Sequence, residues 1–368
     1  MLYLDANATE PLRPEARAAM LAAADTMGNP SSVHAAGRAA RRVLEDAREF
    51  LATRFGTRPA DIVFTSGGTE ADALAIHALG TGRRVIIGAT EHDAVRSAAP
   101  DATILPVDGD GVADLQALSK LLADASPTLV CLMWANNETG AIQPIAEAAA
   151  ICRHLGALLH VDAVQAAGRI PVELGSIHSL AISSHKLGGP QGAGALLLAP
   201  DVAGISPMIR GGGQERGRRG GTHALPAIAG FAAAAQLSLG HDEDAAKGIA
   251  AIRDAIEATA ISAGATVCGN GAPRLLNTTC LALPGIRADA QVMALDLDGI
   301  CVSAGAACSS GKVASSHVLT AMGLGPLAGQ AIRVSLPWNV TADAAPVFAA
   351  GYARMADRLR AALAPRAA

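Results

Sequence analysis

Aromatic residues are nearly absent from this chain of 368 residues, in which Phe, Tyr and Trp together make up 2%. Hydrophobic residues nevertheless account for 51%, and much of that fraction is alanine. We therefore expect a core built from Ala, Val, Ile and Leu, with closely packed helices. The length suits two domains, or one large domain with a smaller partner.

Strong charge of either sign is also lacking. The chain has 29 Lys and Arg residues against 33 Asp and Glu residues, which gives a formal net charge of -4. This balance predicts neither a nucleic-acid partner nor a membrane-surface partner. The basic run RGRR at 216–219 is short and flanked by glycines, so it does not change that expectation.

Long apolar segments, a targeting signal and paired cysteines are missing as well. The alanine-rich run at 226–240 is too short to span a membrane, and the first residues, MLYLDANATE, lack the basic and apolar regions of a signal peptide. None of the six cysteines forms a CxxC motif and no His/Cys spacing fits a zinc site, so we expect no bound metal. These features predict a reduced, soluble, cytoplasmic protein.

Short apolar runs alternate with helical stretches through the first two thirds of the chain. The runs lie at 61–65, 84–88, 102–107, 127–134, 157–162, 179–184 and 194–199. Near-continuous apolar strands of this kind predict an α/β fold with a mainly parallel sheet sandwiched by helices. From about residue 245 the pattern changes to that of a smaller α+β domain. We therefore predict a large domain over residues 14–245 and a small domain formed by residues 1–13 and 246–368.

Polar motifs directly follow the predicted strands. They are SGGTE at 66–70, TEH at 90–92, WANNETG at 134–140, VDAVQ at 161–165 and SSHK at 183–186. Because the carboxyl ends of parallel strands meet at one edge of a sheet, we expect these motifs to line one ligand site.

Lys186 and Asp162 are the most informative residues in these motifs. Lys186 follows a buried strand, where desolvation would lower the pKa of its amine and suit it to form a Schiff base; a loop salt bridge is the alternative. Asp162 also ends a strand, and its alternative role is a helix N-cap. Together they supply the lysine and the carboxylate that pyridoxal phosphate chemistry requires, the carboxylate keeping the pyridine nitrogen protonated.

Three further features fit such a site, although each is weak alone. The small residues of SGGTE would let backbone N–H groups approach a phosphate, with Thr69 adding a hydroxyl at a helix start. His92 follows a strand and could stack on a cofactor ring and move protons, or could be structural. Cys308 lies in AGAACSSG, where no neighbour is large enough to pack a core.

Ten motifs in order give these features a common explanation. They are YLDANAT, NPSSVH, FTSGGTEAD, TEHDAV, ANNETGAIQPI, HVDAVQAAG, SSHKLGGPQGAGAL, GGGQERGRRGGT, AGAACSSG and AIRVSL. Over nearly its whole length the chain resembles the cysteine desulfurases of the NifS/IscS type, within the class V aminotransferases. The resemblance implies the fold of fold-type I pyridoxal phosphate enzymes.

The resemblance also implies a role for each matching residue. Lys186 would carry the cofactor as a Schiff base, and Asp162 would pair with its pyridine nitrogen. His92 would stack on the ring, with Gln165 and Asn137 near its phenolic oxygen. The phosphate would be held by Gly68, Thr69, Ser183 and His185, and by Thr222 of the other subunit, which makes the site a property of a homodimer.

For the substrate, the resemblance implies that Arg333 and Asn29 grip the carboxylate of L-cysteine. Arginine suits this because its planar fork binds a carboxylate at two points. Cys308, on a loop at about 304–316, would attack the substrate sulfur, so that L-alanine leaves and a persulfide remains for a sulfur acceptor, possible destinations including iron–sulfur cluster assembly. Either His92 or the substrate amine could deprotonate the thiol, and the sequence does not choose between them.

This chain departs from the family pattern at several positions. Glu10 stands where relatives often carry a second threonine, and Ala304 and Ala306 replace hydroxyl residues before the cysteine. We therefore expect a more flexible loop over 306–314. The chain also ends soon after its last predicted helix, without the extension that docks an iron–sulfur scaffold protein in longer relatives.

Two other functions remain open from the sequence. The first is a selenocysteine lyase or another lyase of the class V family. The second is a non-catalytic scaffold that binds pyridoxal phosphate, although the presence of all the expected chemical residues favours an enzyme.

Overall fold

The computed structural model describes residues 1–202, 204–238, 243–305 and 315–363. Within these residues, a seven-stranded sheet has the strand order β2-β8-β7-β6-β5-β3-β4. Its strands are β2 (Ile62–Thr65), β3 (Arg84–Gly88), β4 (Thr103–Leu105), β5 (Thr128–Met133), β6 (Leu158–Asp162), β7 (Ser179–Ser183) and β8 (Gly194–Leu198). The five strands β3, β4, β5, β6 and β7 pair in parallel, whereas β8 pairs antiparallel with both of its neighbours, β7 and β2. The prediction of a mainly parallel sheet is therefore confirmed.

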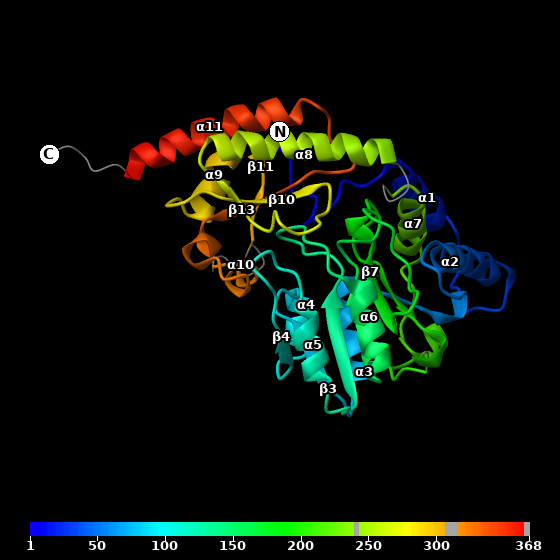
Figure 1. Ribbon diagram of the computed structural model, residues 1–368. Helices are drawn as coiled ribbons and strands as arrows, with labels where there is room; N and C mark the ends of the chain where they lie inside the picture. Colours follow the sequence, from blue (N-terminus) through cyan, green and yellow to red (C-terminus); the bar gives the residue numbers. More distant parts are fainter. Residues whose placement is uncertain (203, 239–242, 306–314, 364–368) are drawn as a thin grey trace.

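Helices cover both faces of this sheet (Figure 1). One face packs against α3 (Gly68–Gly80) and α4 (Asp93–Ala98). The other packs against α2 (Ala35–Arg54), α5 (Leu115–Leu121), α6 (Ile145–His154) and α7 (Leu225–Gln236). A further helix, α1 (Pro14–Ala24), lies against α7. Alternate strand residues serve the two cores, as expected for strands buried on both faces.

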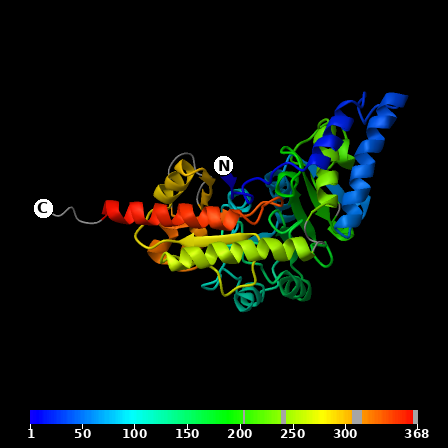
Figure 2. The ribbon, with the colours of Figure 1, turned by 90° about the horizontal axis from the view of Figure 1, so that it is seen from above.

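A second sheet belongs to the other end of the molecule. Its order is β12 (Ser303–Ala304), β13 (Ala331–Ser335), β10 (Thr278–Ala282) and β9 (Thr266–Val267), all antiparallel. Around it lie α8 (Glu243–Ser262), α9 (Ala288–Leu297), α10 (His317–Ala321) and α11 (Ala344–Leu363). Helices α8 and α11 run side by side over this sheet in both views (Figures 1 and 2).

The N-terminal segment lies with this second sheet rather than with the first. Strand β1 (Leu2–Tyr3) pairs in parallel with β11 (Ile300–Cys301), and Asp5 forms a bridge to Ser335 at the end of β13. The segment then crosses to the large sheet, where Glu10 N–H donates to the carbonyl of His185. These pairings fit the predicted grouping of residues 1–13 with 246–368, but the domain boundaries themselves stay a prediction.

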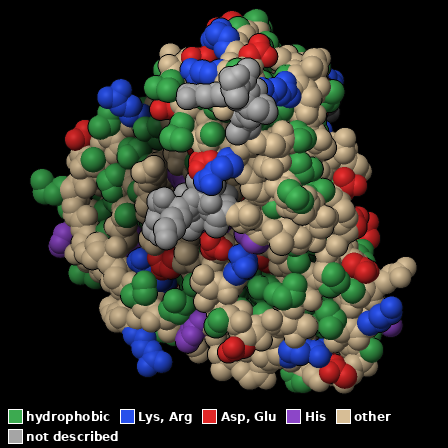
Figure 3. Space-filling view, turned by 90° about the vertical axis from the view of Figure 1, so that its left-hand side faces the viewer, with side chains coloured by type: hydrophobic (Ala, Val, Ile, Leu, Met, Phe, Trp, Pro, Cys, Tyr) green, Lys and Arg blue, Asp and Glu red, His purple; other side chains and the backbone are tan. Residues whose placement is uncertain are grey.

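The surface matches the charge balance of the sequence. On the face shown in Figure 3, acidic and basic side chains are interspersed rather than gathered into one field. No helix among the described residues is both long enough and apolar enough to cross a membrane.

Candidate functional site

A cavity of about 620 Å³ opens where the carboxyl ends of β5, β6 and β7 face the second sheet. Most of the residues singled out in the sequence line it: Gly68, Thr69, His92, Asn137, Asp162, Gln165, Ser183, His185, Lys186 and Arg333. The expected convergence of strand ends therefore occurs, with Arg333 added from β13 on the opposite wall.

At the start of α3, Gly68 forms a cradle with Val164 and Ser183 in the wall of the cavity. A Cβ atom on Gly68 would lie 2.5 Å from the side chain of Val164 and 3.5 Å from Cβ of Ser183, so a side chain there would not fit. Ser183 Oγ is buried without a hydrogen-bond partner in the structure. An unpaired buried hydroxyl at the positive end of a helix, beside a glycine turn, is suited to a phosphate oxygen.

Lys186 lies in the short 3-10 helix η2 (Ser184–Lys186) that follows β7. Its Nζ donates to the backbone carbonyls of Asn7 and, at 3.0 Å, Ala8. Burial, helped by the positive charges of Arg333 and Arg169, lowers the pKa of Lys186 to about 7. The amine is therefore partly unprotonated at neutral pH, as a Schiff-base lysine requires.

Asp162 ends β6 and is buried, with Oδ1 accepting a bond of 2.8 Å from the N–H of Val164. Burial, together with the nearby Asp72, raises the pKa of Asp162 to about 7. A carboxylate in this setting gains most from a cationic partner, which a protonated ring nitrogen supplies. The residues of the cavity thus fit both the phosphate and the pyridine ring of pyridoxal phosphate.

His92 is the N-cap of α4 and is half-buried beside Asp162. Its Nδ1 accepts a bond of 3.1 Å from the N–H of Ala94, so the neutral ring carries its proton on Nε2. Burial lowers the pKa of His92, which keeps the ring neutral and suited to lie on an aromatic ring and exchange a proton.

The guanidinium of Arg333 is paired through two of its nitrogens, and the third has no partner in the structure. Its Nη2 donates to Asp5 Oδ1 at 2.7 Å and its Nη1 to the carbonyl of Asn137 at 3.2 Å, whereas the buried Nε has no partner in the structure. Gln165 is fixed by a bond of 2.9 Å from Nε2 to the carbonyl of Asn7. His185 approaches Thr9 Oγ1 through Nδ1 at 3.1 Å, and burial beside Lys186 lowers the pKa of His185 to about 4.

Sequence reasoning missed several residues of the cavity wall. Asp5, Asp72, Glu138 and His317 all line the cavity. Behind it, His160 is fully buried, with Nε2 at 3.1 Å from Asp72 Oδ1 and Nδ1 at 2.8 Å from Ser179 Oγ. The available signal was a histidine two residues before Asp162 on an otherwise apolar strand.

Glu138 connects the WANNETG motif to the second sheet. Its Oε2 accepts a bond of 2.6 Å from Ser316 Oγ, and a Cβ on Gly305 would lie 2.1 Å from the same oxygen. A side chain at 305 would therefore have to displace the buried Glu138 carboxyl group from its bond to Ser316. His317, next to Ser316, reaches the backbone carbonyl of Glu91 at 2.9 Å.

The departures from the family pattern have different outcomes. Glu10 is buried and accepts bonds from Arg169 at 3.3 Å and from the N–H of Trp338 at 3.1 Å, so it forms an ion pair at the position where the family pattern often has a second threonine. Ala304 ends β12 and is buried. Cys308, Ala306 and the loop expected to be flexible, 306–314, lie outside the described residues.

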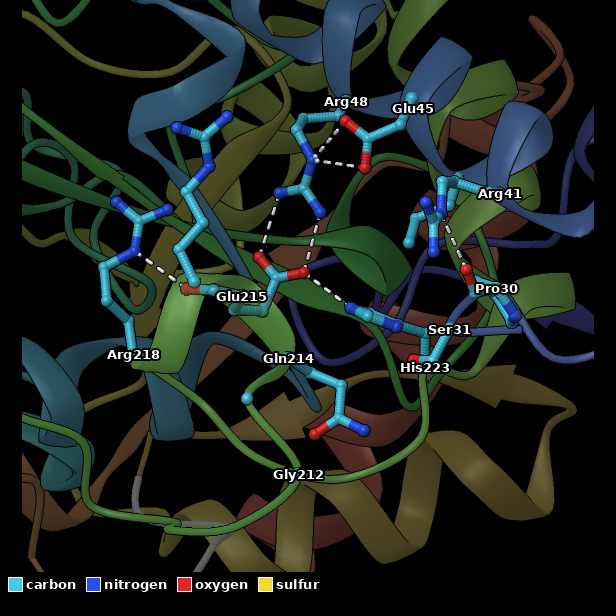
Figure 4. A pocket seen from close by; sticks show the side chains of 13 residues that line it. Pro30, Ser31, Arg41, Glu45, Arg48, Gly212, Gln214, Glu215, Arg218 and His223 are labelled. Carbon is cyan, nitrogen blue, oxygen red and sulfur yellow. Dashed lines mark hydrogen bonds and ion pairs between the residues drawn. The ribbon is translucent and has the colours of Figure 1, made fainter. Parts of the chain in front are cut away.

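Two predicted site residues lie away from the cavity. Asn29 and Thr222 are exposed and do not line it. Their neighbours in the chain line a second cavity of about 340 Å³, whose lining includes Pro30 and Ser31, which follow Asn29, and His223, which follows Thr222 (Figure 4). One chain alone therefore does not bring these two residues to the first cavity.

Comparison with known proteins agrees with this geometry. Residues 2–345 match the model of the family described as Aminotransferase class-V, and the chain belongs to this family, whose members use pyridoxal phosphate. A cysteine desulfurase from Cereibacter sphaeroides is 44% identical over 362 residues, which covers 93% of this chain and 92% of that protein. An IscS-like cysteine desulfurase from Mycobacterium tuberculosis is 38% identical, covering 91% of each chain. Among solved structures, a NifS-like protein from Rickettsia africae superimposes with a TM-score of 0.90 at 35% identity, covering 97% of this chain and 99% of that one.

Proposed function

We propose that this protein is a cysteine desulfurase, which takes sulfur from L-cysteine, releases L-alanine and carries the sulfur as a persulfide on Cys308. The observation that carries the proposal is that Lys186 and Asp162, at the ends of neighbouring strands of the large sheet, line one cavity together with Arg333 of the second sheet. A lysine with a lowered pKa, a buried carboxylate and an arginine fork are the groups needed to bind the cofactor and an amino acid together.

Pyridoxal phosphate, when bound, supplies an electron sink for the bonds around the α-carbon of an amino acid. Its phosphate would be held by Gly68, Thr69, Ser183 and His185. Asp162 would pair with its pyridine nitrogen and His92 would stack on its ring, while Gln165 and Asn137 would serve its phenolic oxygen. The buried, unpaired Ser183 Oγ and the glycine cradle at residue 68 support this placement.

Within this arrangement the residues of the chain bind the substrate and move protons. Arg333 binds the carboxylate of L-cysteine, for which its unpaired Nε and its position opposite Lys186 suit it. Lys186, with a pKa of about 7, releases and takes up a proton at neutral pH. His92 offers a second group for proton exchange through Nε2.

Sulfur transfer assigns the last role to Cys308. Its thiolate attacks the substrate sulfur, a sulfur–sulfur bond forms, and the substrate carbon–sulfur bond breaks with its electron pair returning to carbon. That carbon then takes a proton, which gives L-alanine.

We further propose that the active protein is a cytoplasmic homodimer in which Asn29 and Thr222 of each chain complete the site of the other. The exposure of both residues, and the presence of their chain neighbours Pro30 and His223 in the lining of the second cavity, support this arrangement. A sulfur-acceptor protein would collect the sulfur from Cys308, with iron–sulfur cluster assembly as one destination.

The test is the stoichiometry of the reaction. Purified protein with pyridoxal phosphate and a reductant should release sulfide and alanine from L-cysteine in equal amounts, and Cys308→Ala should abolish both. Rates on cysteine, selenocysteine and cysteine sulfinate are compared in parallel. Activity that Cys308→Ala leaves intact, or activity confined to selenocysteine, would replace the proposal with a selenocysteine lyase.

A further inference from the structure

The second cavity surrounds a buried ionic cluster that the proposed chemistry does not use. Glu215 lies in the 3-10 helix η4 (Gln214–Gly217), and Figure 4 shows the side chains of Arg48 and His223 directed at its carboxylate. Glu215 Oε1 accepts bonds from Arg48 Nη2 at 2.7 Å and His223 Nε2 at 2.6 Å. Its Oε2 accepts from Arg48 Nη1 and from the N–H of Phe64, both at 2.9 Å.

The charges of Glu215 and Arg48 are satisfied within the chain, so these two side chains have no free group to offer a ligand. Burial alone would raise the pKa of Glu215, but the bonds from His223 and Arg48 outweigh it and lower the pKa to about 2. The third nitrogen of Arg48, Nε, binds Glu45 at 3.1 Å. A buried carboxylate with four donors and an arginine with every nitrogen paired have no capacity left for an anion.

The backbone around Glu215 is held in an unfavourable conformation. Glu215 and Arg216 have φ values of 47° and 58°, in the left-handed region that residues other than glycine rarely adopt. Arg218 fixes the turn by donating to the carbonyls of Glu215 at 3.0 Å and Ala60 at 2.8 Å. Strain of this kind persists only where surrounding contacts impose it, and it is typical of segments that orient a functional group.

The residue that this turn orients is Thr222, because both of its neighbours in the chain are tied to the cluster. The N–H of Gly221 donates to Gln214 Oε1 at 3.0 Å, and His223 binds Glu215 as described. Thr222 itself stays exposed. Its backbone is therefore fixed on both sides while its hydroxyl remains available to another molecule.

The same loop also contacts the phosphate cradle of its own chain. Phe64, which donates to Glu215, lies on β2, two residues before Ser66 of the SGGTE turn. Arg219 pairs with Glu70 at 2.8 Å, and Glu70 accepts the N–H of Ser66 at 2.7 Å. The segment that contains Glu215 and Arg219 therefore connects the phosphate cradle of its own chain to the exposed Thr222.

We propose that Glu215, acting through His223, is a positioning residue that holds Thr222 to bind the cofactor phosphate in the other subunit. The inference rests on the proposed homodimer with shared sites. It predicts that a substitution in the cluster weakens binding of the cofactor phosphate in the site of the other subunit, while binding of the pyridine ring is unchanged.

The first experiment titrates apoprotein with pyridoxal 5'-phosphate and, separately, with pyridoxal, which lacks the phosphate. His223→Ala should weaken affinity for the phosphorylated form about 10-fold, the value expected for one lost charge-assisted hydrogen bond, and leave pyridoxal affinity unchanged. Glu215→Gln should act in the same direction. Glu257→Gln, which removes a partly buried ion pair with Arg274 that lines neither cavity, is the control and should change neither affinity. Equal losses for both ligands would overturn the inference.

The second experiment uses mixed dimers to separate this inference from the proposal beneath it. A Lys186→Ala chain is paired with a His223→Ala chain, so that the one site with a functional lysine receives Thr222 from a chain with an intact cluster. That site should recover wild-type phosphate affinity. A mixed dimer of Lys186→Ala with Thr222→Ala serves as the reference. If its one site with a functional lysine does not recover phosphate affinity, the proposed shared site is wrong. If this reference dimer recovers phosphate affinity but the dimer that contains His223→Ala does not, only the positioning role is refuted.

Discussion

The burial of Lys186 leads to a prediction about stability that is independent of activity. The pKa of this lysine falls from 10.5 to about 7, and at about 1.4 kcal/mol per unit the buried charge destabilises the native apoprotein by up to about 5 kcal/mol. Lys186→Met removes the charge and also removes the bonds to two backbone carbonyls. The loss of these bonds offsets about 1–3 kcal/mol of the gain in the free energy of unfolding. We therefore expect the variant to have a free energy of unfolding about 2 kcal/mol higher at pH 7.

The pH dependence gives this prediction its sign. Between about pH 7 and pH 10.5 the unfolded chain binds a proton that native Lys186 has lost, so wild-type stability rises with pH over this range. The stability of the variant lacks this rise with pH. The difference in the free energy of unfolding between variant and wild type should therefore be largest at pH 7 and below, and should shrink as the pH approaches 10.5. Other titrating groups are common to both proteins and cancel in the difference.

The assay is urea unfolding of the two apoproteins at several pH values and one fixed protein concentration, because the stability of the proposed dimer would depend on concentration. Lys120→Met, at an exposed lysine of α5, is the matched control and should show no change in advantage with pH. A variant less stable than wild type at pH 7, or a difference that is constant from pH 7 to pH 10.5, would refute the claim that Lys186 is desolvated.

Three further predictions concern cofactor and substrate binding. Gly68→Ala should weaken binding of pyridoxal 5'-phosphate in titrations, because its Cβ would lie 2.5 Å from the Val164 side chain in the cradle; unchanged affinity would contradict the cradle. Ser183→Ala should leave the melting temperature within a degree or two yet weaken phosphate affinity about 10-fold, since its hydroxyl is unpaired in the structure; a large loss of stability would count against it. Arg333→Lys should raise KM for cysteine about 10-fold or more with a smaller change in kcat, because it loses the planar fork; an unchanged KM would reject the carboxylate assignment.

The sequence was sufficient to predict the sheet and one side of the site, for a physical reason. Apolar strands separated by helices can hardly be buried except in a parallel sheet, and the carboxyl ends of such strands meet at one edge. The positions of Lys186 and Asp162 follow from that rule, since each ends or follows such a strand. The antiparallel placement of β8 could not be predicted in this way, because its apolar run at 194–199 resembles those of the parallel strands.

The remaining parts of the site depend on contacts between segments far apart in the sequence. Asp5 reaches Arg333 only because β1 joins the second sheet, and the pairing of Asp72 with His160 requires α3 to pack over β6. The outward display of Thr222 depends on a left-handed turn at Glu215 that local propensity disfavours. Side chains brought together by tertiary packing or by a second subunit leave little trace in local sequence pattern.

The central claim, that Cys308 receives the sulfur, is tested most directly by mass spectrometry of the holoenzyme after one turnover with L-cysteine and without reductant. The peptide that contains Cys308 should gain the mass of one sulfur atom, in amounts equal to the alanine formed, and a reductant should remove it. Alanine formed without added sulfur on that peptide, or sulfur found instead on the buried Cys131, Cys152, Cys268 or Cys280, would contradict the mechanism.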